Sequence, residues 1–388
     1  VDKPTLEASL ALDGLEVVVV PGQIGRALGV DANLATIASQ LKSLTDGLIP
    51  LAIKDTPPLI LDATVQAETA RQILSAPLTL RNPDAKEGET STWVIDPATL
   101  ADMLIIERAA NETGGRQFRI ALDPAQLQAY LENIGPSLAV DPVDARFIFD
   151  DDTRQLDLLT SSVIGRRLLP EETAAAINTQ LAGGVHTVDL LFAYTPPAVT
   201  SDATAESLGI TGLVSAQTSY FYGSSTSRIQ NITTASSRFH GLLVAPRATF
   251  SMADVLGDIS LDTGYAEALI IFGDRTIKGV GGGVCQVSTT LFRTVFFGGY
   301  QIDERYSHAY RVYYYELAAS GSVNTNLAGL DATVFVPLVD FKFTNDSDNW
   351  LLMETYVDAA ARSLTWKFYS KPDGRAVEWT TSGLRNRV

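Results

Sequence analysis

An internal repeat in the first half of the chain is the feature that most limits how it can fold. Residues 24 to 41 read IGRALGVDANLATIASQL, and residues 164 to 181 read IGRRLLPEETAAAINTQL. A fixed period indicates that one supersecondary unit is built twice. The matching positions lie 140 residues apart and include Gly25/Gly165, Arg26/Arg166, Leu28/Leu168, Ile37/Ile177, Gln40/Gln180 and Leu41/Leu181. Further on, Thr56-Pro-Pro returns as Thr195-Pro-Pro at an offset of 139.

Each copy predicts a strand, a glycine-containing turn, a helix with an acidic first turn, and a second strand that the Thr-Pro-Pro ends. In the first copy the helix should present Leu34, Ile37 and Leu41 to a core. We expect the Gly-Arg pair to be structural, with the arginine bonded to nearby carbonyl or carboxylate groups; ligand binding is the alternative. Two further helix starts, Asp96-Pro-Ala-Thr-Leu and Asp123-Pro-Ala-Gln-Leu, combine a capping aspartate with proline at the first helical position.

From about residue 213 the character of the chain changes, and a glycine-rich segment leads into its only cysteine. Residues 279 to 292 read GVGGGVCQVSTTLF. The glycines let the backbone approach a ligand closely, and the apolar spacing from Cys285 to Phe297 is typical of a buried helix. Cys285 should therefore lie near a helix N-terminus, where the helix dipole and the free N–H groups stabilise a thiolate. The alternative is a small buried hydrophobic residue.

A cysteine nucleophile needs a base, and the chain has three histidines. We expect turn, capping or packing roles for His186 and His240, so His308 is the candidate base. Asp331 is the candidate third group, which would orient the imidazole and stabilise its protonated form, with Glu304 as the substitute. A turn aspartate that accepts backbone N–H bonds is the alternative for Asp331.

The same glycine-cysteine block supplies the candidates for substrate binding. Main-chain amides around Gly283, with the side chain of Gln286, could surround a developing oxyanion. The candidate substrate-binding residues are Gly282, Gly283, Gln286, Ser288 and Thr289. One thiol without a second Cys/His cluster does not make a zinc site, and neither a P-loop lysine nor the dinucleotide fingerprint accompanies the glycines. We therefore expect no metal and no cofactor.

Four segments carry a resemblance to a known family: Gly264-Tyr-Ala-Glu-Ala, the block at 279 to 292, Glu304-Arg-Tyr-Ser-His308, and Gly329-Leu-Asp331-Ala-Thr-Val. In this order and approximate spacing they resemble the VanW family, and the repeated region resembles the peptidoglycan-binding domain repeats found in front of VanW domains. The resemblance implies tandem α+β peptidoglycan-binding-like modules followed by an α+β VanW domain with a β-rich C-terminal region. The expected boundaries are 1–145 for the first module, 146–212 for a partial second copy and linker, and 213–388 for the VanW domain.

The composition limits the class of partner. The 29 basic and 45 acidic side chains give a net charge of −16, which opposes nucleic acid, anionic membrane surfaces and anionic wall polymers and favours a neutral or zwitterionic ligand. These residues contain no run of 18 apolar residues and no signal-peptide pattern. Because the chain starts at Val1 rather than at methionine, we expect an upstream segment such as a signal or an anchor.

Together these patterns predict an extracytoplasmic protein of the cell envelope or cell surface that binds or acts on peptidoglycan. As an enzyme it would perform cysteine-based acyl transfer or amide hydrolysis on wall peptides, in the manner of a transpeptidase or amidase. The VanW family is associated by name with glycopeptide-resistance clusters, which does not supply a reaction. The alternatives are a non-catalytic envelope binding or scaffold protein and a structural subunit of a surface assembly. The expected partners are peptidoglycan or another wall component and envelope proteins, with no nucleic acid; the oligomeric state is left open.

Overall fold

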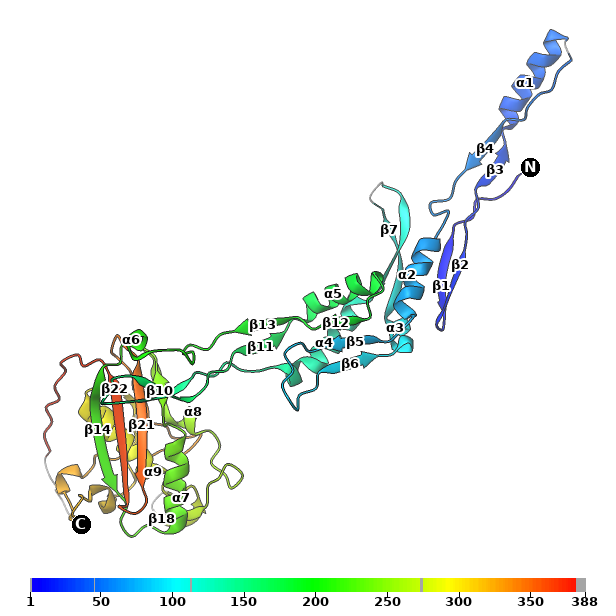
Figure 1. Ribbon diagram of the computed structural model, residues 1–388. Helices are drawn as coiled ribbons and strands as arrows, with labels where there is room; N and C mark the ends of the chain where they lie inside the picture. Colours follow the sequence, from blue (N-terminus) through cyan, green and yellow to red (C-terminus); the bar gives the residue numbers. More distant parts are fainter. Residues whose placement is uncertain (1, 45, 112–113, 273–274, 382–388) are drawn as a thin grey trace. The chain divides into compact units, whose positions relative to one another are not determined.

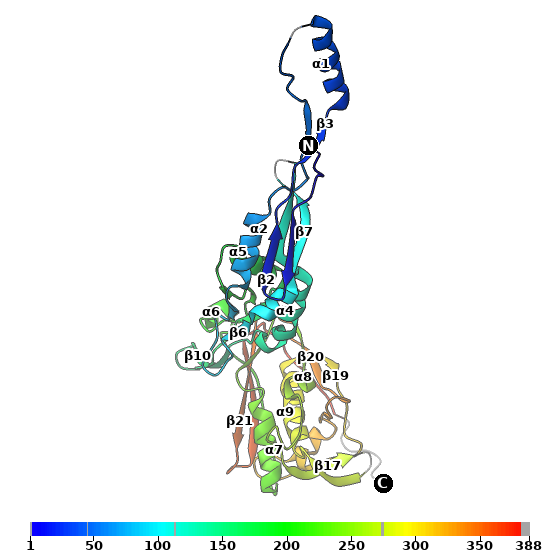
Figure 2. The same ribbon diagram turned by 90° about the vertical axis from the view of Figure 1, so that its right-hand side faces the viewer.

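The computed structural model describes residues 2–44, 46–111, 114–272 and 275–381, which form two compact units (Figures 1 and 2). The N-terminal unit comprises Val1–Asp141 and Gly165–Thr195, and the C-terminal unit comprises Pro142–Ile164 and Pro196–Val388. Both units mix helices with mainly antiparallel strands, so the predicted α+β class is confirmed. The predicted domain boundaries at 145 and 212 stay a prediction. The compact units are divided differently, since residues 165–195 belong to the N-terminal unit.

The N-terminal unit is built from short sheets, and helices contribute many of the residues of its core. Its strands are β1 (Ser9–Asp13), β2 (Glu16–Val20), β3 (Gly25–Leu28), β4 (Ile53–Thr56), β5 (Leu78–Arg81), β6 (Thr92–Ile95), β7 (Leu104–Ala110), β8 (Arg116–Leu122), β11 (Gly165–Leu168), β12 (Thr187–Asp189) and β13 (Phe192–Thr195). Its helices are α1 (Val30–Ser43), α2 (Thr64–Leu74), α3 (Pro97–Met103), α4 (Pro124–Leu138) and α5 (Pro170–Ala182). The largest sheet has the order β12-β5-β6, in which β12 runs parallel to β5. Helices α2 and α4 each pack on α5, and the three helices supply much of the core.

Both helix starts predicted from an Asp-Pro pair are confirmed. Asp96 accepts hydrogen bonds from the backbone N–H groups of Ala98 and Thr99, and Asp123 accepts one from Ala125. In each case proline occupies the first turn, where its missing N–H removes no intrahelical bond.

The two repeat copies share one strand register. In the first copy Gly25 pairs with Thr56, and in the second Gly165 pairs with Thr195. The Gly-Arg pair of the second copy is structural, as predicted, because the guanidinium of Arg166 donates to two backbone carbonyls and to the carboxylate of Glu89.

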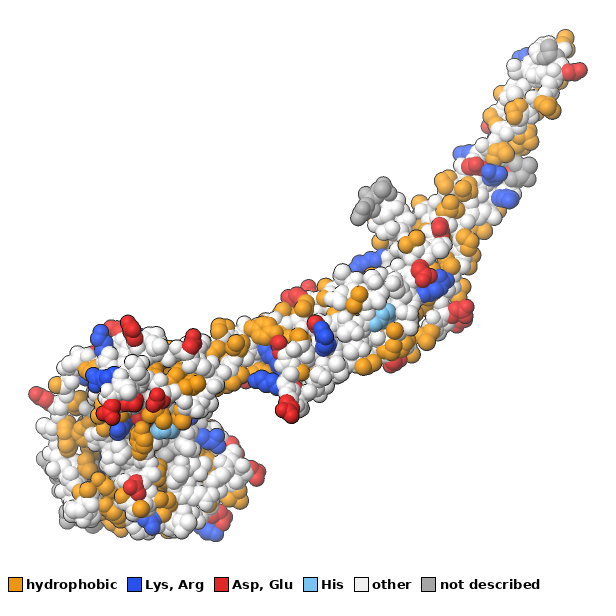
Figure 3. Space-filling view, in the orientation of Figure 1, with side chains coloured by type: hydrophobic (Ala, Val, Ile, Leu, Met, Phe, Trp, Pro, Cys, Tyr) orange, Lys and Arg blue, Asp and Glu red, His pale blue; other side chains and the backbone are white. Residues whose placement is uncertain are grey.

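The copies differ in what covers their helices. On α5, Ala174, Ile177 and Leu181 are at most 3% exposed and pack into the core. The equivalent side chains on α1 are largely exposed, at 58% for Leu34, 37% for Ile37 and 70% for Leu41. Figure 3 shows hydrophobic side chains on the surface of this segment. The expectation that these three residues face a core is therefore wrong, because α1 contributes no residue to the hydrophobic core of the described chain.

Polar contacts hold α1 to its own hairpin instead. The Asn33 side chain donates to the carbonyls of Gly29 and Ala52 and accepts the N–H of Ala52. In the second copy the Thr173 hydroxyl accepts the N–H of Leu191 from the corresponding place. The β–α–β unit is thus closed by local hydrogen bonds in both copies, whether or not the apolar face of its helix is buried.

The repeat supplies a matched pair for a stability measurement. Ile177→Ala should lower the free energy of unfolding of the N-terminal unit by about 2–5 kcal/mol, because it removes buried methyl groups from a filled core. Ile37→Ala, the same change at the equivalent position of the first copy, should change it by no more than about 0.5 kcal/mol. Pulsed hydrogen exchange at increasing urea, measured on peptides from α2, reports this unit separately. Equal losses for the two variants would show that α1 is buried in solution.

The C-terminal unit has a four-stranded antiparallel sheet of order β14-β22-β21-β15. The sheet and helix elements are β9 (Arg146–Phe149), β10 (Leu156–Thr160), α6 (Ala205–Leu208), β14 (Gly212–Tyr220), α7 (Thr226–Ser237), β15 (Leu242–Val244), β16 (Thr249–Ser251), α8 (Met252–Leu256), β17 (Glu267–Phe272), β18 (Arg275–Val280), α9 (Val284–Gly298), β19 (Gln301–Glu304), β20 (Lys342–Thr344), β21 (Leu351–Asp358) and β22 (Ser363–Ser370). Two 3₁₀ helices, η1 (Tyr313–Glu316) and η2 (Thr325–Leu327), lie between β19 and β20.

The four-stranded sheet separates two cores of this unit. Trp366 and Phe368 face α7 and α9, whereas Leu352 and Tyr369 face the β9–β10 hairpin. The predicted β-rich C-terminal region is confirmed by β20, β21 and β22. None of the helices within the described residues is both long and apolar enough to cross a bilayer.

Candidate active site

A glycine turn brings the cysteine to the start of a buried helix. Gly283 caps α9 at φ 119°, and Cys285 is the second residue of the helix, as predicted. At Gly282 a Cβ atom would lie 2.4 Å from the carbonyl oxygen of Leu269, so only glycine fits there. The buried side chain of Asn231 holds this turn, because it donates to the Gly282 carbonyl. The N–H of Cys285 falls in the first turn, where helical amides lack intrahelical acceptors.

The three predicted catalytic residues lie together in the structure. Nδ1 of His308 lies 2.5 Å from Oδ2 of Asp331, which also accepts the backbone N–H of His308 at 2.9 Å. This leaves Nε2 available to a neighbouring thiol, and Cys285 lines the same cavity as His308. The His308 side chain is 3% exposed and that of Asp331 is 14% exposed, so both are shielded from solvent.

The charges of the site favour a protonated imidazole. Burial is the largest influence on His308 and lowers its pKa, but hydrogen-bonding and electrostatic interactions with Asp331 and Cys285 together outweigh it and raise the pKa to about 9. Burial also raises the pKa of Asp331, yet hydrogen bonds from His308 and the positive charges of His308 and Arg305 lower it overall. Both shifts favour an imidazolium at His308 with a carboxylate at Asp331 behind it.

Helix α9 positions the aspartate through polar side chains on the same face as Cys285. The Ser288 hydroxyl donates to the Ala332 carbonyl at 2.6 Å, and the Thr289 hydroxyl accepts the N–H of Ala332 at 3.2 Å. One helical turn on, the Arg293 guanidinium donates to the Leu330 carbonyl at 2.7 Å. These bonds fasten the residues on both sides of Asp331 along the helix.

The predicted substrate-binding residues divide into two groups. Gly282 and Gly283 line a cavity of about 580 Å³ that Cys285 and His308 also line. Gln286, Ser288 and Thr289 are fully buried and do not line it. Ser288 and Thr289 share the helix face of Cys285 but lie one turn further along, where residues 330–334 cover them.

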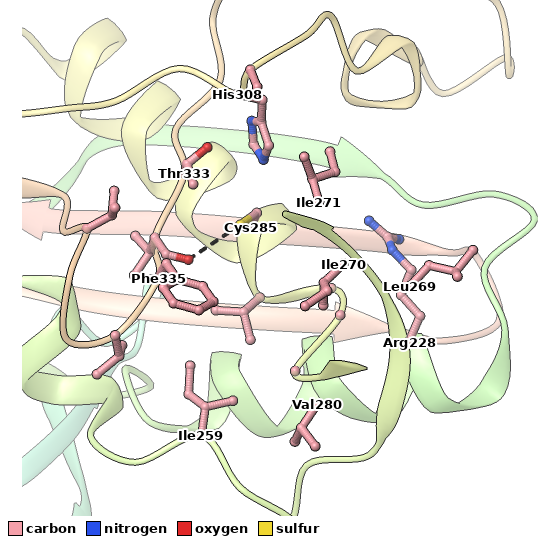
Figure 4. A pocket seen from close by; sticks show the side chains of 18 of the residues that line it. Arg228, Ile259, Leu269, Ile270, Ile271, Val280, Cys285, His308, Thr333 and Phe335 are labelled. Atoms are coloured by element: carbon pink, nitrogen blue, oxygen red, sulfur yellow. Dashed lines mark hydrogen bonds between the residues drawn. The ribbon is translucent and has the colours of Figure 1, made fainter. Parts of the chain in front are cut away.

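Several cavity residues were not identified from the sequence. The Arg228 guanidinium and the rings of Tyr314 and Tyr315 form part of the wall. Figure 4 shows Cys285 with His308 above it, Arg228 to its right, and its hydrogen bond to the Val334 carbonyl, at 3.6 Å. The remaining wall is mostly apolar and includes Ile259, Leu269, Ile270, Val280 and Phe335.

Thr333 is a further polar residue of the cavity wall. Its hydroxyl is buried and has no hydrogen-bond partner among the described residues. The sequence offered no signal for Thr333 or Arg228 except their position near segments of polar and glycine residues, which does not indicate a cavity.

The other candidates have structural partners. His240 accepts the N–H of Thr355, and both ring nitrogens of His186 contact backbone carbonyls, so the predicted packing and turn roles are confirmed. Glu304 pairs with Lys342 at 2.9 Å rather than with His308. Within the described part of the chain, no group of three or more His, Cys, Asp or Glu side chains could hold a metal ion.

Comparisons with known proteins support the expected resemblance. Residues 227–369 match the family model described as "VanW like protein", and residues 103–189 match the model described as "Putative peptidoglycan binding domain". The resemblance to both is confirmed. The second model matches one segment, so a repeat of the peptidoglycan-binding domain stays a prediction.

Two curated relatives match the chain in part. The "Uncharacterized protein YoaR" of Bacillus subtilis is 38% identical over 134 residues, which are 34% of this chain and 41% of the relative. The "Vancomycin B-type resistance protein VanW" of Enterococcus faecalis is 29% identical over 121 residues, which are 31% of this chain and 42% of the relative. The matched part thus spans less than half of either relative.

One solved structure, titled "Structure of the Ldtfm-avibactam carbamoyl enzyme", is 12% identical and covers 36% of this chain and 48% of its own chain. Its TM-score is 0.23, which is too low for the likeness to carry an argument.

The pKa values of the two histidines of the C-terminal unit should be shifted in opposite directions from the ordinary value. His308 should lose its proton near pH 9, because Asp331 and Cys285 favour the charged ring. His240 should titrate below 6.5, because burial and the nearby Arg146 charge lower its pKa. Imidazole NMR signals followed from pH 5 to 10 measure both. Asp331→Asn should shift the His308 midpoint downward and leave that of His240 in place; a His308 midpoint at or below 6.5 in the unmodified protein would refute the ion-paired site.

Proposed function

We propose that this chain, whose residues 227–369 match the VanW-like family, is an extracytoplasmic cell-envelope protein that performs acyl transfer or amide hydrolysis on wall peptides. The observation that carries the proposal is the Cys285, His308 and Asp331 arrangement at the start of α9, in a cavity wall. The match of residues 103–189 to a peptidoglycan-binding model supports a cell-wall-associated role, with peptidoglycan as the partner.

The arrangement supplies every group that such a reaction needs. The Cys285 thiolate attacks the carbonyl carbon of a peptide bond and forms a C–S bond, while first-turn N–H groups of α9 stabilise the oxyanion. His308 gives its Nε2 proton to the departing amine as the C–N bond breaks, which leaves a thioester on Cys285. Asp331 keeps the imidazole oriented throughout.

The second half of the reaction restores the site. An amine or a water molecule attacks the thioester carbonyl, and His308 accepts the proton of this nucleophile. The C–S bond then breaks and returns the thiolate beside the imidazolium. Attack by an amine transfers the acyl group to a new peptide, and attack by water hydrolyses the original amide.

A non-catalytic binding or scaffold role is the second candidate. It would be favoured by a thiol buried away from every histidine, whereas Cys285 is partly exposed and lines the same cavity as His308. The exposed apolar face of α1, with Leu34, Ile37 and Leu41, is the observation that favours an additional role in a surface assembly. That role would involve the N-terminal unit and leaves the site free to act.

The first test measures thiol reactivity. Because Cys285 is the only cysteine, iodoacetamide reports on this site alone. At pH 7 we expect His308→Ala to slow alkylation by on the order of tenfold or more, since it removes the cation that stabilises the thiolate. His240→Gln changes a histidine of the same unit outside the cavity and should leave the rate within about twofold. A thiol that reacts only after the protein unfolds would refute the enzymatic proposal and favour the binding or scaffold role.

The second test measures turnover. Incubation with purified peptidoglycan stem peptides should give cross-linked or shortened peptides detectable by mass spectrometry, together with a covalent acyl adduct on Cys285. Cys285→Ala should abolish both products, and Asp331→Asn should slow their formation by about 10²-fold or more, because the imidazole loses its orientation. Equal product from the Cys285→Ala protein would refute the proposed chemistry.

A further inference from the structure

Arg228 places a positive charge in the wall of the Cys285 cavity without a carboxylate to neutralise it. We propose that its guanidinium is a specificity-determining subsite for a carboxylate of the acyl-donor peptide. The inference rests on the proposed function and narrows its substrate class to peptides that carry a free carboxylate near the carbonyl that Cys285 attacks.

The partners of Arg228 are all neutral. Its Nη1 donates to the Ser224 hydroxyl at 2.6 Å, its Nη2 donates to Oε1 of Gln286 at 2.9 Å, and its Cζ lies 5.0 Å from the centre of the Tyr314 ring. A guanidinium has five N–H donors, so these bonds leave donors free. Among the described residues no Asp or Glu forms a salt bridge with Arg228.

Other arginines of this unit are paired with carboxylates, which Arg228 is not. Arg305 pairs with Asp331, Arg311 with Glu316, and Arg375 with two aspartates. The chain carries 45 acidic against 29 basic side chains, so carboxylates are abundant. The residues that line the cavity nevertheless include no Asp, Glu or Lys within the described part of the chain.

Two sets of contacts fix Arg228 relative to the reacting groups. Gln286, which accepts its hydrogen bond, directly follows Cys285 on α9. On the other side, Tyr314 packs on Tyr315 with ring centres 4.8 Å apart, and Tyr315 packs on His308 at 5.2 Å. The guanidinium and the imidazole therefore lie at the two ends of a pair of aromatic rings.

The apolar surroundings of Arg228 strengthen its attraction for an anion. Most of the cavity wall is apolar, and a guanidinium in such surroundings attracts an anion more strongly than one exposed to water. Arginine also presents parallel N–H groups that match the two oxygens of a carboxylate. A zwitterionic peptide thus fits the cavity even though the chain as a whole is acidic.

The test compares two alkylating reagents that differ in one charge. Iodoacetate and iodoacetamide alkylate a thiolate by the same reaction. The intrinsic reactivity of Cys285 therefore affects both rates equally, and the ratio of the two rates measures how strongly the cavity attracts a carboxylate. Arg228→Gln should lower the iodoacetate-to-iodoacetamide ratio by about tenfold, because the subsite charge is lost. Arg228→Lys should retain part of it.

Arg238→Gln is the matched control, since it removes the same charge from the other end of α7, outside the cavity lining. Its ratio should stay within about twofold of the unmodified protein. An unchanged ratio in Arg228→Gln, with iodoacetamide still reacting normally, would overturn the subsite while leaving the proposed function intact.

A binding measurement tests the subsite even if Cys285 proves unreactive. In a Cys285→Ala background, calorimetry compares N-acetyl-alanyl-alanine with its C-terminal amide. We expect the acid to bind at least about fivefold more tightly, and Arg228→Gln to abolish this preference. Equal affinities of acid and amide in the Cys285→Ala protein would overturn the inference.

Discussion

The site depends on the hydrogen bonds between α9 and the segment that carries Asp331. Ser288 and Arg293 bind the carbonyls of Ala332 and Leu330, and the aspartate between them binds His308. The same helix carries Cys285, so one rigid element positions both Cys285 and Asp331, and His308 lies between them. Loss of such a bond inside a core leaves a buried polar group unpaired, at a cost of about 1–3 kcal/mol. The position of Asp331 relative to Cys285 is thus maintained by buried residues that do not line the cavity.

The electrostatics of the cavity run against those of the whole chain. The chain has a net charge of −16, yet the cavity gathers the helix N-terminus, a His308 imidazole with a raised pKa, and the Arg228 guanidinium. Positive groups beside the thiol stabilise its anion, and the same groups compensate the charge that develops on an attacked carbonyl. Asp331 is held behind the imidazole, so its negative charge supports the base without facing the cavity.

The sequence was informative where chemistry is local. The N-caps at Asp96 and Asp123 are set by neighbouring residues, and a single thiol with three histidines left few combinations for the site. The apolar spacing predicted a buried helix from Cys285 onward, but not that Ser288 and Thr289 bond to Ala332 instead of lining the cavity. Arg228 and Thr333 could not be found, because they reach the cavity from segments about 50 residues from Cys285 on either side, and only the tertiary fold brings them there.

The two repeat copies show that the interactions that form the β–α–β unit differ from those that bury its helix. Both copies close their β–α–β unit with the same strand register and with a polar side chain early in the helix, Asn33 or Thr173. In the second copy Ile177 is buried in the core, whereas the equivalent Ile37 of the first copy is exposed. Exposed apolar area costs about 25 cal/mol per Å² relative to burial, so the α1 face gains free energy from any apolar surface of matching shape. Local hydrogen bonds therefore allow the first copy to hold its structure while it keeps a hydrophobic face available for contact.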